Sequence, residues 1–287
     1  MPLSREEAKA LAVAHNLPAV NAYRSLKNYV RECIRLRHFT WHYSIGRTIV
    51  ATIANNLGLF WDFINPVLLS ITYYFTFGVL LGTKGDSSQF ITFLIAGVFT
   101  WQLFSTTFTT ASQSLMKGQD LAESLRLPRI LLPISATIQA TLRSIPSLLM
   151  LFPIAMLGGS RPTIWWLTVP FIFLLTALLS LALALFGALI IDSVRDAAQT
   201  VPLIIRVLMF MSGVFYDVEK RFSTLPDGIR IIAENNPAAL VLKFTRTALS
   251  PNLHHVTKFN VIYVVSLTAT LLIIGLLMYW RRDNRDN

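Results

Sequence analysis

The sequence predicts an all-α integral membrane protein with six transmembrane helices, a basic amphipathic helix before them and short helices before the last span. Of the 287 residues, 54% are hydrophobic and only 14% are charged, whereas soluble domains carry about 25% charged residues. Apolar segments recur along the chain, most of them long enough for the roughly 20 residues that cross a bilayer as a helix. The net charge of +10 fits the basic loops that membrane proteins keep on the cytoplasmic side.

Six apolar segments define the expected transmembrane domain, residues 57–280. It follows a cytoplasmic segment, 1–56, and precedes a short cytoplasmic tail, 281–287. The expected spans are about 57–82, 89–115, 128–157, 163–191, 200–217 and 259–280.

The distribution of basic residues predicts the orientation. An even number of spans places both termini on one side of the membrane. If that side is cytoplasmic, the inner segments 1–56, 116–129, 192–206 and 281–287 hold roughly twice as many Lys and Arg as the outer ones. The positive-inside rule therefore favours cytoplasmic termini. The first residues have no apolar signal-peptide core, so we expect the first span to direct insertion.

Residues 20–45 form an amphipathic stretch. Apolar side chains recur at helical spacing at Tyr23, Leu26, Val30, Ile34 and Trp41, and basic side chains flank them at Arg24, Lys27, Arg31 and Arg35. Such a helix is typical of the membrane interface. The four cations are candidates for binding a lipid pyrophosphate headgroup, and the positive-inside bias alone would also account for them.

The segment 218–258 is the least regular part of the expected transmembrane domain. It holds polar turns around two short apolar helices, near 228–234 and 238–249. These helices are too short to cross a bilayer. Two interpretations remain open: an outer loop lying on the headgroups, or a re-entrant hairpin that dips into a shared pathway.

Aromatic side chains and one arginine are candidates for a substrate pathway. Trp101, Phe104 and Phe108 share one face of the second span, as do Tyr73 and Phe77 on the first. Aromatic faces can stack on sugar rings, but these residues could equally face lipid or the core. Arg143 lies deep in the third span, which suggests a functional site or pairing within the bundle.

Chemistry for catalysis or energy coupling is missing from the sequence. It lacks the phosphate-binding G-x-x-x-x-G-K-[ST] loop, the H-E-x-x-H zinc motif and the G-x-S-x-G nucleophile motif. His38 and His42 have metal-ligand spacing but no third ligand nearby, and the single Cys33 excludes an internal disulfide. We therefore expect no catalytic residue, metal or cofactor in this chain, and no nucleic-acid partner, since the membrane accounts for the positive charge.

Four motifs carry a resemblance to a known family. They are Leu57-Gly58-x-x-Trp61-x-x-x-Asn65-Pro66, Ala96-Gly97-x-x-x-Trp101-x-x-Phe104, Leu127-Pro128-Arg129-Ile130-Leu131-Leu132-Pro133, and Asn236-Pro237 followed by Arg246. In this order and over most of the chain, they resemble the motifs of ABC-2-type export permeases.

Within that family, the length, the amphipathic N-terminal helix and the lack of a fused nucleotide-binding domain resemble the polysaccharide-exporting branch. That branch is Wzm-like and includes O-antigen, teichoic acid and galactan exporters. The resemblance implies a homodimer of this chain with two copies of a separate ABC ATPase, which binds ATP and Mg²⁺. It also implies outward movement of a polyprenyl-pyrophosphate-linked glycan across a bacterial cytoplasmic membrane.

The segment 117–126 is the candidate coupling helix for that ATPase. It is short and polar and is bounded by Gly118 and Pro128, so it could form a rigid knob that transmits motion. A solvated linker is the alternative. The residues expected to reach the ATPase are Gln119, Asp120, Leu121, Glu123 and Arg126.

Other functions compete with glycan export. A permease for a drug or small lipid would share the fold. A membrane-embedded transferase acting on polyprenyl phosphates would need clustered carboxylates for metal binding, whereas those of this chain are scattered. A non-catalytic scaffold is a third possibility.

Overall fold

The computed structural model describes residues 25–53, 58–80, 87–125, 127–218, 221, 226–251 and 256–285. In these ranges the regular structure is helical, without strands. Its elements are α2 (Leu26–Arg35), α3 (Arg37–Ile53), α4 (Gly58–Tyr73), the π-helical η1 (Tyr74–Leu80), α5 (Ser87–Ser112), α6 (Ser114–Ser124), α7 (Leu131–Leu157), the 3₁₀-helical η2 (Ile164–Thr168), α8 (Val169–Ser193), α9 (Ala197–Met211), α11 (Asp227–Glu234), α12 (Pro237–Leu249) and α13 (Lys258–Arg285).

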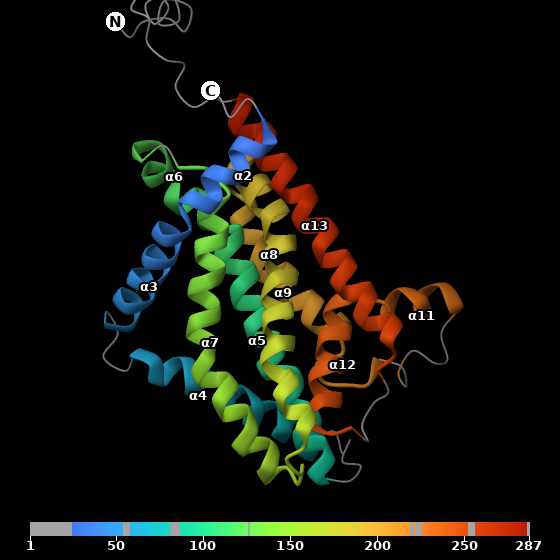
Figure 1. Ribbon diagram of the computed structural model, residues 1–287. Coiled ribbons are helices and arrows are strands. Elements are labelled where there is room, and N and C mark those ends of the chain that lie inside the picture. Colours follow the sequence, from blue (N-terminus) through green and yellow to red (C-terminus); the bar gives the residue numbers. More distant parts are fainter. Residues whose placement is uncertain are drawn as a thin grey trace, which may run out of the picture.

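Helix α5 lies at the centre of the bundle and packs against both α7 and α8. Its residues from Leu94 to Phe104 are almost all buried, and α13 covers α8. Helices α2 and α6 lie where α13 ends (Figure 1). We call this end of the bundle the α6 end.

Four segments of the described structure are long and apolar enough to cross a membrane. They are Gln89–Ser112, Leu131–Leu157, Ile164–Ser193 and Lys258–Arg285. They correspond to the second, third, fourth and sixth predicted spans.

The other two predicted spans are not confirmed as membrane crossings by this criterion. Helix α9 has 15 residues, about 22 Å at 1.5 Å per residue, which is less than the roughly 30 Å hydrocarbon core. The first predicted span contains Asp62 and Pro66 and is divided into α4 and η1.

The amphipathic stretch forms two helices rather than one. Ser25 caps α2 by accepting a hydrogen bond from the Asn28 N–H, and the chain leaves helical geometry at Leu36 before α3 begins. Helix α3 then packs against α7, where the Ser44 hydroxyl donates to the Ser135 carbonyl at 3.1 Å.

The interpretation of 218–258 as a surface loop is wrong for α12. This helix packs against α5, α8 and η2, and its residues from Ala238 to Leu242 are buried. Helix α11 differs, because Ile231 and Ile232 are 58% and 74% exposed, and it projects from the side of the bundle (Figure 1).

Candidate functional site

A cavity of about 410 Å³ lies between α5 and α9, with polar residues on its α5 side and mostly apolar residues on its α9 side. Polar residues of α5 recur three and four residues apart, which places them on one face of the helix. From α5 the lining residues are Trp101, Gln102, Ser105, Thr106, Thr109 and Thr110, and from α9 they are Pro202, Ile205, Arg206 and Met209.

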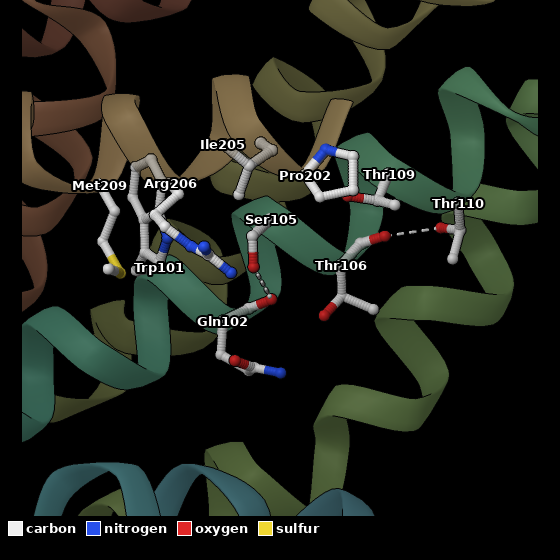
Figure 2. Close-up of a pocket in the computed structure, with 10 residues that line it drawn as sticks. All are labelled: Trp101, Gln102, Ser105, Thr106, Thr109, Thr110, Pro202, Ile205, Arg206 and Met209. Carbon is white, nitrogen blue, oxygen red and sulfur yellow. Dashed lines mark hydrogen bonds between the residues drawn. The ribbon is translucent and has the colours of Figure 1, made fainter. Parts of the chain in front are cut away.

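The polar groups of this cavity can hydrogen-bond to a ligand. The Ser105 and Thr110 hydroxyls donate to the carbonyls of Gln102 and Thr106 within α5, at 3.2 and 2.7 Å, so their oxygens can still accept hydrogen bonds. Arg206 extends from α9 toward this face of α5 (Figure 2). Among the described residues, the Arg206 guanidinium has no acidic partner within salt-bridge distance. The cavity therefore offers hydroxyls, an amide and a cation beside one indole.

The predicted aromatic face of α5 lies mostly in the core. Phe104 is 2% exposed and Trp101 is 5% exposed, and their ring centroids are 5.1 Å apart. Phe108 continues the row by stacking on Phe104. Only Trp101 of the three lines the cavity. From the sequence alone, no role was assigned to the polar face of α5 beside these rings, although the helical spacing of its residues is visible in the sequence.

Tyr73 and Phe77 gather around Phe215, in the turn that follows α9. The ring centroids of Tyr73 and Phe77 lie 4.4 and 4.7 Å from that of Phe215. The turn needs Gly213, whose φ is +69°, a conformation that side chains disfavour. These two aromatic residues thus fix α4 and η1 to the end of α9 and do not line the cavity.

Arg143 pairs with Asp62 across α7 and α4. Its Nε and Nη2 atoms donate to the two carboxylate oxygens at 2.7 and 2.5 Å. The Ser147 hydroxyl also donates to the Asp62 carbonyl at 2.7 Å. This bidentate pair matches the pairing expected within a bundle, and it anchors α4 to α7.

The segment predicted for coupling, 117–126, does contain a short helix. This helix, α6, begins three residues earlier than the predicted segment. Gln119 and Asp120 are exposed, and Leu121 is half-buried. Leu115 and Ala122 are buried, in a cluster with side chains of α7 and α8. Glu123 belongs to α6 but its side chain is not described, and Arg126 lies outside the described residues.

A buried carboxylate joins three segments at the α6 end. Asp283 of α13 accepts a hydrogen bond from the Tyr29 hydroxyl of α2 at 2.9 Å. It also accepts one from the Arg129 backbone N–H at 3.2 Å, just beyond α6. Tyr29 is fully buried, and burial followed by the Asp283 charge raises the pKa of its phenol, which therefore stays a donor. We call Tyr29, Arg129 and Asp283 the Asp283 cluster.

The basic residues of α2 lie outward from that cluster. Lys27, Arg31 and Arg35 are exposed, and Arg35 pairs with Glu32 at 3.5 Å. Arg24 lies outside the described residues. The residue of α2 that is fully buried is Tyr29, which lay outside the predicted apolar stripe. Burial raises the pKa of the neighbouring Cys33 thiol to about 12, which keeps it protonated.

Arg246 is a buried cation that holds α12 in place. It is 3% exposed, and its Nη2 donates to the carbonyls of Gly213 and Val214 at 2.9 and 2.8 Å. Its guanidinium carbon lies 3.5 Å from the Phe93 ring centroid. Gly97 of α5 leaves room for this arrangement, since a Cβ there would lie 2.7 Å from Arg246 Nη2.

Comparison with known proteins identifies the family. Residues 41–249 match the ABC-2 type transporter family. The chain belongs to the ABC-2 type transporter family. As a member, it is a membrane-embedded transport subunit, and ABC-2 permeases work with an ABC ATPase partner. The resemblance drawn from the four motifs is confirmed.

Three relatives extend this similarity along most of the ABC-2 permease. All are named O-antigen export system permease protein RfbA. One from Klebsiella pneumoniae is 22% identical over 223 residues, covering 77% of this chain and 83% of the relative. A second from that organism is 21% identical over 225 residues, covering 78% and 83%. The protein from Myxococcus xanthus is 27% identical over 171 residues, covering 60% and 64%.

The structure shows the physical role of several residues of the ABC-2 motifs. Gly97 and Arg246 belong to two motifs far apart in sequence and contact each other. Asn236 caps α12 by accepting a hydrogen bond from the Ala238 N–H at 3.0 Å, and Pro237 occupies the first turn. Proline is favourable there because its missing N–H is not needed.

Proposed function

We propose that this permease exports a polyprenyl-pyrophosphate-linked glycan across the bacterial cytoplasmic membrane. The observation that carries the proposal is the polar face of α5 opposite Arg206. A row of hydroxyl and amide groups on an otherwise apolar bundle suits a substrate rich in hydroxyls, whereas an apolar drug would offer these groups no hydrogen bond. The names of the three RfbA relatives support the same substrate class.

The proposed assembly has two copies of this chain and two copies of a separate ATPase that holds ATP and Mg²⁺. In each copy the chain would cross the membrane six times, with α4–η1 and α9 as the additional crossings and α12 re-entrant. The α6 end would be cytoplasmic, together with both termini. Supporting this orientation, α6, the end of α13 and the basic helix α2 share that end.

Helix α6 is the proposed contact with the ATPase. Its residues Gln119 and Asp120 are exposed, while the buried Leu115 and Ala122 pack it onto α7 and α8. A helix held on one side and exposed on the other can pass on a push from the ATPase as a rigid-body movement. The exposed cations of α2 would attract the pyrophosphate headgroup at the same end.

Substitutions in the cavity test the proposed substrate path. In the reconstituted complex, Gln102→Leu with Arg206→Leu is expected to raise the glycan concentration for half-maximal ATPase stimulation roughly tenfold. Two polar contacts of about 1 kcal/mol each would be lost, less some compensation by water. Basal ATP hydrolysis should stay unchanged, because neither residue lies near α6.

The matched control is Arg195→Leu, an exposed arginine in the turn before α9 that does not line the cavity. It should leave stimulation unaltered. Unchanged stimulation in the double variant would remove the cavity from the substrate path. Stimulation by apolar drugs and none by the lipid-linked glycan would overturn the substrate class itself.

A further inference from the structure

A second cavity lies between α8 and α13 at the α6 end, outside the proposed glycan path. Its volume is about 730 Å³, and its walls combine apolar and basic side chains. Phe186 and Ile190 come from α8, and Met278 comes from α13. Ile190 and Met278 are 59% and 41% exposed, so the apolar wall is open to the surroundings of the bundle.

The basic side chains of this cavity stand on the last two turns of α13. Arg282 pairs with Asp192 of α8 at 2.5 Å and also donates to the Leu189 carbonyl. That pair is neutral overall. Arg281 and Arg285 are exposed and line the same cavity. Among the described residues, neither has an acidic partner within salt-bridge distance, so the cavity carries a net positive charge.

We propose that this cavity binds an anionic phospholipid, with its phosphate between Arg281 and Arg285 and an acyl chain along Ile190 and Met278. Both helices are long enough to cross the membrane, so their ends lie at headgroup depth. Arginine binds phosphate oxygens through two N–H groups at once. The apolar wall extends from the arginines toward the middle of the two helices, which is the shape of a lipid rather than of a free anion.

Lipid retention in nanodiscs tests this site. The full chain is placed in phosphatidylcholine nanodiscs with a defined fraction of phosphatidylglycerol, and bound phosphatidylglycerol is counted by native mass spectrometry. Arg281→Gln with Arg285→Gln is expected to weaken phosphatidylglycerol binding about twenty-five-fold, since each basic residue near a lipid phosphate contributes about a factor of five. The variant should also lose the rise in unfolding temperature that phosphatidylglycerol gives the wild type.

The matched control removes the same charge from the other end of the same two helices. Arg161 precedes η2 and α8, Lys258 begins α13, and both are exposed. Arg161→Gln with Lys258→Gln should retain the lipid. Met278→Gln tests the acyl wall without changing charge and should weaken binding severalfold.

Three outcomes would overturn the proposal. Equal loss of phosphatidylglycerol from both charge variants would mean a general effect of surface charge. Equal stabilisation by inorganic phosphate in pure phosphatidylcholine nanodiscs would mean an anion site without a lipid. Full retention in the Arg281→Gln, Arg285→Gln variant would mean that the lipid does not bind here.

Discussion

Gly97→Ala is expected to lower the free energy of unfolding by about 2 kcal/mol, an unusually large cost for one methyl group. The new Cβ would lie 2.7 Å from Arg246 Nη2 and 2.8 Å from the Val214 carbonyl oxygen, closer than such atoms approach. Relieving the overlap requires α5 to shift or Arg246 to give up its contacts, and overpacking of this kind costs about 1–3 kcal/mol. The unfolding midpoint in detergent and the yield of monodisperse protein measure the effect.

Gly46→Ala provides the matched control. Gly46 lies in α3, and a Cβ there would meet nothing within 4 Å. Because alanine favours helices over glycine by up to about 1 kcal/mol, this variant should be as stable as the wild type or more so. If the two substitutions behave alike, the close contact between α5 and Arg246 is wrong.

Disrupting the Asp283 cluster is expected to impair both stability and coupling. Asp283→Ala leaves the buried Tyr29 hydroxyl and the Arg129 N–H without their shared acceptor, a loss of about 3 kcal/mol for a broken buried charged contact. Tyr29→Phe removes one hydrogen bond to a carboxylate and should cost about 1.5 kcal/mol. Thermal unfolding of the purified chain measures both.

The milder variant separates coupling from folding. Tyr29→Phe loosens α2 from α13 while Arg129 still binds Asp283, so export should fall more than ATP hydrolysis in the reconstituted complex. Tyr43→Phe in α3 is the control, since Tyr43 is half-buried and its ring stacks on Phe39. If Tyr29→Phe exports a normal amount of substrate per ATP hydrolysed, the Asp283 cluster has a structural role only and no role in coupling.

Local pattern predicts most of the helices of this fold. The long apolar runs of α7 and of η2 with α8 begin and end close to the predicted bounds of the third and fourth spans, because their length and hydrophobicity are sufficient to predict them. The break between α2 and α3 at Leu36 could not be predicted from the sequence, because no glycine or proline lies there. It follows from packing, since α2 turns toward α13 through Tyr29 and α3 turns toward α7 through Ser44.

Contacts between distant residues are the part that the sequence does not reveal. Arg143 was a candidate for the pathway because its partner Asp62 is 81 residues away. Helix α12 was a possible surface loop because it is too short to cross a bilayer. Its burial depends on Arg246, whose charge is accommodated by carbonyls and a ring from other elements. The polar residues of α5 that line the cavity recur at helical spacing in the sequence. The functional assignment nevertheless went to the aromatic residues beside them.

The proposed export of a lipid-linked glycan is tested most directly by measuring its ATP-dependent movement in sealed inside-out vesicles. The vesicles contain this chain and its ATPase, and a radiolabelled polyprenyl-pyrophosphate glycan is supplied on the outer face. We predict that ATP makes the label resistant to an added glycosidase, and that vesicles without this chain give no protection. Protection of the label that does not depend on ATP, or that is as large in vesicles without this chain, would contradict the proposed function.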